Sequence, residues 1–242
     1  MAARNLFSFP VIAYSGEVDK QKQAADVMAE AFAAHDRELT HVIGPKMGHK
    51  YDDASKKKIL TFVRKAFEYG REANPQEVHV QTQTLKHNRV RWIYVSGLRE
   101  HWKDSRVDAY YEAEASTLEM KTKNVSSLIL MHPNPNCCGG LNGYALSIDG
   151  SEIKVPSGRL SVSLVRRSDG TWAVEDPPEG LRKKHGLQGP IDDAFLSRFL
   201  VVAPDKPSGS ELIDRWVAFE LAHLQKRWRE LFRGELPIKK AY

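Results

Sequence analysis

Apolar residues recur with two different periods along this chain, and the period changes at Asn74-Pro75. Before that point, short apolar runs alternate with segments in which apolar residues are spaced three and four apart. After it, apolar and polar residues alternate one by one. The first spacing is typical of helices, and strict alternation is typical of half-buried strands. The pattern therefore predicts an α/β part, residues 1–74, followed by a β-rich part.

The α/β part is predicted to contain two strand–helix units. Residues 9–14 and 39–43 are the predicted strands, and residues 20–34 and 53–69 are the predicted helices, with Gly70 suited to a C-cap. This order favours a parallel crossover connection. Two parallel strands alone would leave open edges and an uncovered apolar surface. We therefore expect this part to belong to a larger sheet.

Residues 75–185 are predicted to form a β-sandwich-like domain. Short strands follow one another closely, with Gly, Asn and Asp between them. Asp149-Gly150 and Asp169-Gly170 are typical of hairpin turns. The predicted strands cover residues 78–84, 90–95, 107–113, 125–130, 144–148, 160–165 and 171–174.

Residues 186–242 are predicted to form a C-terminal α/β segment that is incomplete. A loop over 186–195 enters a short helix, residues 199–202 form a strand, and residues 211–232 form a long helix. Six apolar side chains are expected near one face of the long helix: Leu212, Trp216, Phe219, Leu224, Trp228 and Leu231. The expected fold class of the whole chain is therefore α/β plus β.

Composition and charge bear on whether the chain binds nucleic acid, spans a membrane or carries an export signal. The 242 residues include 36 Lys+Arg and 31 Asp+Glu, so the net charge is +5. The basic runs are short and scattered, which is typical of solvated faces, and no nucleic-acid partner is predicted. No apolar run approaches the roughly 18 residues that a membrane span needs. The first residues also lack the basic start and apolar core of a signal peptide. We expect neither a membrane span nor an export signal in this chain.

Metal and cofactor sites are poorly supported by the sequence. Cys137 and Cys138 are adjacent, which strains a disulfide ring, and two thiols alone make a poor zinc site. The nine histidines show no metal-ligand spacing. Asp192-Asp193 could bind a cation, but its position at a helix start favours capping. Gly139-Gly140 lies among predicted strands, which weakens a phosphate-binding interpretation. No metal and no cofactor are predicted.

Two residues stand out as candidates for catalysis, namely Asp19 and His49. Each follows a predicted parallel strand, and functional sites of open α/β sheets form at the carboxyl ends of such strands. A carboxylate there can orient an imidazole and stabilise its protonated form. The alternative is structural: Asp19 could be only a helix N-cap, and His49 could be a loop histidine that bonds its neighbours. The spacing alone leaves both interpretations open.

Two motifs around these residues resemble a known enzyme family. The segments 10–19 (PVIAYSGEVD) and 43–51 (IGPKMGHKY) are similar to the last part of the catalytic domain of prolyl-oligopeptidase-type serine peptidases. In that family a Gly-Glu-x-Asp turn carries the acid of the catalytic triad, and a Gly-His-x-Tyr loop carries the base. The resemblance implies an α/β-hydrolase fold with Asp19 as the acid and His49 as the base.

The resemblance continues into the β-rich part. Three segments are similar to a β-rich extension found in large bacterial members of the family: residues 88–98 with His101-Trp102, residues 122–125 and residues 186–195. The resemblance implies no role for these residues. It does imply that the complete protein can be exported, while this chain itself leaves the compartment unassigned.

The family's nucleophile motif, Gly-x-Ser-x-Gly, does not occur in this sequence. Ser15 lies on the acid's own turn, and Ser208 lacks the strand-to-turn context of such a motif. We therefore expect a fragment of a serine hydrolase that is inactive by itself. The intact protein would cleave a peptide or an ester, with an upstream part of the hydrolase domain as partner.

The rival hypothesis is a binding module without catalytic activity. In it, the β-rich domain would hold a glycan, a peptide or the rest of a larger protein. A cluster of aromatic residues could form such a platform, although most of its members are expected to pack in the core: Trp92, Tyr94, Trp102, Tyr110 and Tyr111.

Overall fold

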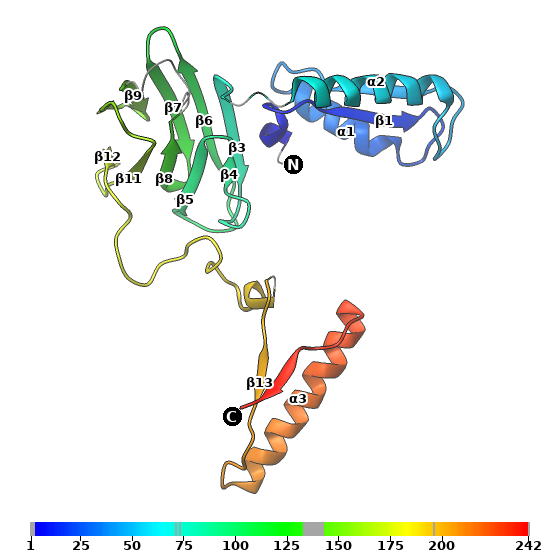
Figure 1. The fold of residues 1–242 in the computed structure, drawn as a ribbon, viewed down its shortest axis with the longest axis vertical. Helices are drawn as coiled ribbons and strands as arrows, with labels where there is room; N and C mark the ends of the chain where they lie inside the picture. The colour runs from blue at the N-terminus through cyan, green and yellow to red at the C-terminus, as the bar shows by residue number, and fades with distance from the viewer. Residues whose placement is uncertain (1–2, 71, 73, 133–142, 196, 242) are drawn as a thin grey trace. The chain divides into compact units, whose positions relative to one another are not determined.

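The computed structural model describes residues 3–70, 72, 74–132, 143–195 and 197–241. The chain divides into two compact units, Met1–Gln188 and Gly189–Tyr242 (Figure 1). The predicted glycine loop, with Cys137 and Cys138, lies outside the described residues. None of the helices in the described ranges is both long and apolar enough to cross a bilayer. The mixture of helices and several sheets confirms the expected class of α/β plus β.

The first unit begins with a small α/β part. A short 3-10 helix precedes two parallel strands and two helices: η1 (Ala3–Leu6), β1 (Ile12–Gly16), α1 (Lys22–Ala33), β2 (Thr40–Gly44) and α2 (Asp53–Tyr69). β1 and β2 pair in parallel over their whole length, which confirms the predicted parallel connection. Ala13 of β1 packs in the cluster that holds α1, whereas Ile12 of β1 faces α2. Because neighbouring strand residues point to opposite faces, the two helices cover opposite faces of this sheet (Figure 1).

The boundaries of α2 follow from its end residues. The Asp52 carboxylate accepts a hydrogen bond from the Ser55 backbone N–H at 2.8 Å, which satisfies a donor in the first turn. Gly70, the predicted C-cap residue, has a φ of +66°. A residue with a Cβ is strained at that angle, so the helix ends at a position suited to glycine.

Two five-stranded sheets follow. Their orders are β10-β9-β7-β6-β3 and β12-β11-β8-β5-β4. The strands are β3 (Glu77–Thr82), β4 (Arg89–Val90), β5 (Ile93–Leu98), β6 (Ser105–Glu112), β7 (Thr117–Lys123), β8 (Val125–Met131), β9 (Tyr144–Ile148), β10 (Ser151–Val155), β11 (Ser161–Arg166) and β12 (Trp172–Val174). Most neighbours are antiparallel, but β7 and β9 pair in parallel.

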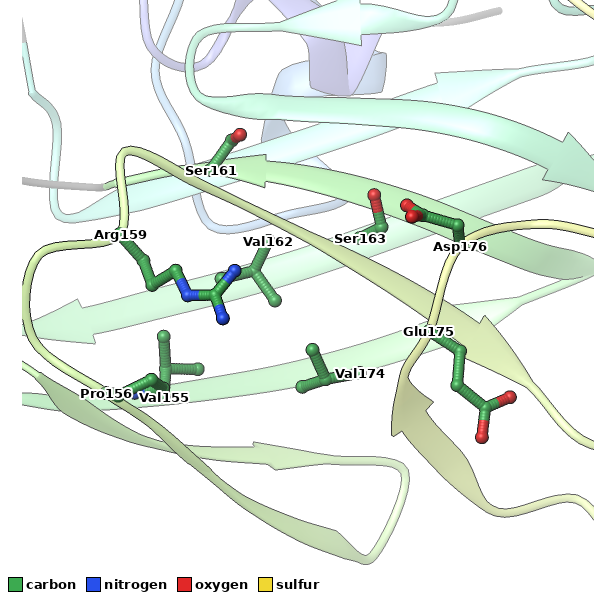
Figure 2. Close-up of a pocket in the computed structure, with 9 residues that line it drawn as sticks. All are labelled: Val155, Pro156, Arg159, Ser161, Val162, Ser163, Val174, Glu175 and Asp176. Carbon is green, nitrogen blue, oxygen red and sulfur yellow. The ribbon is translucent and has the colours of Figure 1, made fainter.

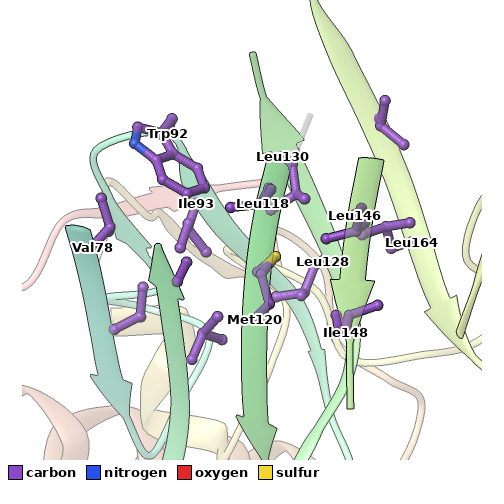
Figure 3. Packing of buried hydrophobic residues seen from close by; sticks show 14 of the residues in the cluster. Val78, Trp92, Ile93, Leu118, Met120, Leu128, Leu130, Leu146, Ile148 and Leu164 are labelled. Atoms are coloured by element: carbon purple, nitrogen blue, oxygen red, sulfur yellow. The ribbon is translucent and has the colours of Figure 1, made fainter. Parts of the chain in front are cut away.

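The two sheets share one hydrophobic core (Figure 3). Burial alternates along the strands; in β6, for example, every second residue from Ser105 to Tyr111 is buried. Val78 and Leu118 of one sheet and Ile93 and Leu128 of the other belong to the same buried cluster. The alternation that the sequence shows is therefore the signature of a two-layer β-sandwich. Trp92 and Tyr111 from the aromatic group lie in this core, whereas Trp102 and Tyr110 are exposed.

The predicted hairpin at Asp149-Gly150 is confirmed. It joins β9 to β10 through a two-residue loop whose φ angles are +47° and +85°. Such a turn needs positive φ at both positions, which Asp and Gly tolerate best. The Asp149 carboxylate also accepts hydrogen bonds from the Thr122 backbone N–H at 2.8 Å and from Trp172 Nε1 at 3.0 Å. The turn therefore ties both sheets together at this end.

Contacts from η1 attach the α/β part to the sandwich within the first unit. The side-chain amide of Asn5 donates to the Gln81 carbonyl at 2.8 Å, and Asn5 Oδ1 accepts from the Gln81 N–H at 2.6 Å. Arg4 pairs with Asp108, and Arg37 pairs with Glu77. His79 lies between Asp108 and Glu77, at 2.6 and 2.7 Å from their oxygens. Hydrogen bonds from a side chain to the backbone, together with ion pairs, thus connect the α/β part to the sandwich.

The second unit contains one strand–helix–strand element. A short 3-10 helix, η2 (Ile191–Phe195), precedes β13 (Val201–Ala203), α3 (Glu211–Phe232) and β14 (Ile238–Lys240), and the two strands pair in parallel. The helix has the predicted limits, but its apolar side chains do not lie on one face. Leu224 and Trp228 are half-buried, whereas Leu212, Trp216 and Phe219 are exposed. The apolar residues of α3 are therefore spread around the helix.

Candidate functional site

The structure places Asp19 and His49 next to each other at the carboxyl ends of β1 and β2. Asp19 lies three residues beyond the last residue of β1, and His49 lies five residues beyond the last residue of β2. Because the strands are parallel and in register, the loops that follow them leave the sheet at the same edge. His49 Nδ1 lies 3.0 Å from Asp19 Oδ2, which is hydrogen-bond distance.

Backbone contacts between the two loops set this geometry. The Glu17 N–H donates to the Gly44 carbonyl at 2.9 Å, and the Val18 N–H donates to the Met47 carbonyl at 3.0 Å. The Glu17 carboxylate accepts from the Lys46 N–H at 2.7 Å. These bonds extend the pairing of β1 and β2 into the turns and carry the acid-bearing loop to the histidine-bearing loop.

Two glycines lie at points of close approach in this site. A Cβ on Gly16 would collide with the carbonyl oxygens of Met47 and Gly48. A Cβ on Gly44 would collide with the hydroxyl of Tyr14, which donates to the Lys50 carbonyl at 2.8 Å. The two loops can approach this closely at Gly16 only because that residue carries no side chain, whereas a Cβ on Gly44 would meet side-chain atoms alone. Gly16 of the first motif therefore has a packing function.

Asp19 is held as an anion. Its side chain is 12% exposed, and Oδ1 accepts a hydrogen bond from the Gln21 backbone N–H at 2.9 Å. This backbone bond, followed by the bond from His49, lowers the pKa of the Asp19 carboxyl below its ordinary value. Asp19 is not the N-cap of α1, because that position is occupied by Gln21. One of its oxygens accepts from the Gln21 N–H in the turn before the helix, and the other faces the histidine.

His49 presents one nitrogen to Asp19 and the other to the exterior. Its side chain is 79% exposed. A carboxylate only accepts hydrogen bonds, so Nδ1 carries the proton in this pair. The neutral ring then has its lone pair on Nε2, which forms no hydrogen bond within the described ranges. A histidine in this state can accept a proton from a nucleophile while the carboxylate stabilises the resulting cation.

Ser15 and Ser208, the two serines considered as nucleophiles, are hydrogen-bonded to residues other than His49. Ser15 is buried, and its hydroxyl lies 3.1 Å from His41 Nε2 rather than near His49. Ser208, in the second unit, accepts from the Ser210 N–H at 3.2 Å just before α3. In the part of the chain that the structure describes, no serine hydroxyl is bonded to His49. Within the described ranges, the site is thus a carboxylate paired with an imidazole, and neither candidate serine is bonded to that imidazole.

The remaining candidates form no metal site in the described part of the chain. Among those residues, no cluster of three or more His, Cys, Asp or Glu side chains could hold an ion. Asp193 lies in η2, and the side chain of Asp192 is outside the described set.

Comparisons with known proteins found no matching family model, no matching curated protein and no matching solved structure.

Proposed function

We propose that this chain supplies the acid and the base of a Ser-His-Asp hydrolase, with His49 as general base and Asp19 as its orienting carboxylate. The observation that carries the proposal is the 3.0 Å contact between His49 Nδ1 and Asp19 Oδ2 at the carboxyl edge of two parallel strands. This is the edge at which open α/β sheets place their functional residues. The proposed fold of residues 1–74 is the last part of an α/β-hydrolase domain of the prolyl-oligopeptidase type.

In the proposed mechanism, a serine hydroxyl attacks the carbonyl carbon of a peptide or ester, and its proton passes to His49 Nε2. The charge on the imidazolium is stabilised by Asp19 through Nδ1–H. His49 then returns the proton to the leaving amine or alcohol, which leaves an acyl-enzyme. A water molecule, deprotonated by the same histidine, releases the acid and regenerates the serine.

The proposal requires a serine and oxyanion donors from another segment of polypeptide, namely the upstream part of the hydrolase domain. The packing of the two loops supports it. A Cβ on Gly16 would collide with the histidine-bearing loop, and the Glu17 carboxylate accepts from the Lys46 N–H, so the Gly-Glu-x-Asp turn is fitted closely to that loop. Tyr51 of the second motif stacks on Tyr14 of β1, with ring centroids 4.3 Å apart. Gly16, Glu17 and Tyr51 thus contribute to holding the pair in place.

The first test concerns this chain alone. Long-range proton–nitrogen NMR spectra should show His49 protonated at Nδ1 in its neutral form. Asp19→Asn should disturb that preference, because an amide can donate to the ring as well as accept from it. His87 is exposed and serves as the control, since its tautomer should not respond. A neutral His49 protonated at Nε2 in the unmodified chain would contradict the proposal.

The second test concerns activity. The chain alone should not hydrolyse p-nitrophenyl acetate faster than His49→Ala. When it is produced in frame with the coding sequence upstream of Met1, His49→Ala should lower kcat by about 10⁶-fold and Asp19→Asn by about 10⁴-fold. His87→Ala is the matched control and should retain full activity. Equal rates for the extended protein and its His49→Ala variant would exclude His49 as the base.

The alternative function is a binding module without catalysis. It is favoured by a hollow of about 440 Å³ at the edge of the sandwich, far in sequence from the Asp19–His49 pair. That hollow can be tested separately from catalysis.

A further inference from the structure

The hollow lies between the terminal strands of the two sheets. β10 ends one sheet and β12 ends the other. They are linked at their first residues, where the Trp172 backbone N–H donates to Ser151 Oγ at 2.9 Å. Their last residues, Val155 and Val174, line the hollow instead (Figure 2). Among the described residues, this strand pair is therefore joined at one end and separated by the hollow at the other.

The floor of the hollow is apolar. Val155, Val162 and Val174 contribute side chains from β10, β11 and β12. Val155 and Val162 belong to the buried core cluster, so the hollow reaches the core of the sandwich from the side. Its volume of about 440 Å³ falls in the range of roughly 300–1,000 Å³ that is usual for small-ligand sites.

The rim carries one cationic side chain without a counter-ion. Arg159, on the loop between β10 and β11, extends over the space beside Val162 (Figure 2). Among the described residues, none forms a hydrogen bond or an ion pair with Arg159, although two carboxylates also line the hollow. Glu175 points away and is paired with Arg167, and Asp176 lies at the opposite end beside Ser163 (Figure 2). The guanidinium is thus positioned for an anion from outside.

The lining restricts the chemistry of that anion. The described residues of the lining include no aromatic side chain, so they do not form the flat apolar surface on which sugars usually stack. A single arginine next to two carboxylates favours one negative charge over the two of a phosphate. A guanidinium matches a carboxylate with two parallel N–H···O bonds. The free edges of β10 and β12 offer backbone donors and acceptors to an extended chain.

We propose that the hollow between β10 and β12 binds the free C-terminus of a peptide with apolar end residues. The terminal carboxylate pairs with Arg159, and the last side chains cover Val155, Val162 and Val174. The hydroxyl of Ser163 and the carboxylate of Asp176, at the other end, accept N–H groups of the preceding residues. This inference does not depend on the Asp19–His49 pair and holds whether or not the protein is a hydrolase.

The probe is the peptide N-acetyl-Gly-Val-Val with a free carboxyl group, and its C-terminal amide is the matched ligand control. Titration of a chain with labelled valine methyl groups reports both affinity and location. We expect the methyl signals of Val155, Val162 and Val174 to shift with the acid. The amide should bind about 10- to 100-fold more weakly, because it loses the charge-assisted hydrogen bonds.

Arg159→Gln removes the charge and preserves most of the length of the side chain. Arg159 is exposed and pairs with none of the residues that the structure describes, so this variant should fold with an unchanged melting temperature and bind the acid about 10- to 100-fold more weakly. Arg182→Gln is the matched control, since Arg182 is equally exposed and does not line the hollow; it should bind like the unmodified chain. Equal affinities for acid and amide, or shifts elsewhere, would overturn the proposal. If this binding is absent but His49 is still protonated at Nδ1, the peptide-binding proposal fails and the hydrolase proposal is unaffected.

Discussion

In the β-sandwich, 22 buried residues form one continuous hydrophobic cluster, whereas the corresponding cluster of the α/β part has three buried residues, Ala3, Phe32 and Leu39. Apolar residues are not missing from the α/β part. Leu60, Val63 and Phe67 of α2 are exposed by 63%, 51% and 87%. Hydrophobic burial is the main source of folding free energy, so the sandwich can stabilise itself while the α/β part depends on contacts with its surroundings.

Some of the contacts that stabilise the α/β part are made with the sandwich. Asn5 bonds both backbone groups of Gln81, and Arg4 pairs with Asp108. The candidate catalytic pair is thus carried by the weaker of the two regions. This difference supports the proposal that the α/β part belongs to a larger hydrolase sheet, because an additional segment would cover the exposed face of α2.

The largest expected effect on stability distinguishes the core of the sandwich from the apolar residues of α2. Leu146→Ala in β9 removes a fully buried side chain and should lower the free energy of unfolding by about 3–4 kcal/mol. Leu60→Ala in α2 removes a side chain that is mostly in solvent and should change it by less than about 0.5 kcal/mol. Urea denaturation of the two variants checks the comparison. Similar losses would show that α2 is covered in solution.

A smaller effect is expected at the candidate site. Gly16→Ala places a methyl group against the carbonyl oxygens of Met47 and Gly48 and should destabilise the α/β part by about 1–3 kcal/mol. It should also separate Asp19 from His49, which removes the Nδ1-protonated tautomer from the NMR spectrum. Gly48→Ala is the matched control, because a Cβ there meets nothing within 4 Å. If both variants keep the Nδ1-protonated tautomer, the close approach of the loops does not determine the contact between Asp19 and His49.

The sequence could predict the elements whose signals are local. The helical spacing over residues 53–69 and the alternation in β3 and β6 depend on neighbours a few positions away, and these elements formed as expected. The closeness of Asp19 and His49 was predictable from parallel strand order and from the two motifs. The hydrogen bond from the Lys46 N–H to the Glu17 carboxylate could not be predicted, because nothing in either segment indicates which backbone group donates to that carboxylate.

Other features depend on contacts that are distant in sequence. β7 and β10 were not predicted as strands, and β7 pairs in parallel with β9, which is not the next strand along the chain. β14 consists of Ile238-Lys239-Lys240, and its strand conformation comes from pairing with β13 rather than from its own residues. The spread of apolar residues around α3 could have signalled that a single apolar face was too simple an expectation.

The smallest effect concerns the electrostatics of the sandwich. Burial alone would raise the pKa of Asp104, but hydrogen bonds from Gln81, Lys123 and Arg106 lower it to about 2. Because the folded pKa is depressed, the stabilisation is present above the unfolded pKa of about 4 and is lost as the pH falls from about 4 to about 2. The shift corresponds to at most about 2 kcal/mol, and solvent screening of this partly exposed carboxylate reduces it to about 1 kcal/mol.

Asp104→Asn should therefore lower the free energy of unfolding by about 1 kcal/mol at pH 7 and by much less near pH 2, where about half of the native carboxyl is also protonated. Urea denaturation of both proteins at pH 7, 4 and 2 measures this dependence. Glu179→Gln removes a charge from an exposed side chain and should give the same small difference at every pH. A loss that is constant with pH in Asp104→Asn would mean that these hydrogen bonds serve packing alone. In that case the greater stability of the sandwich over the α/β part would rest entirely on its hydrophobic core.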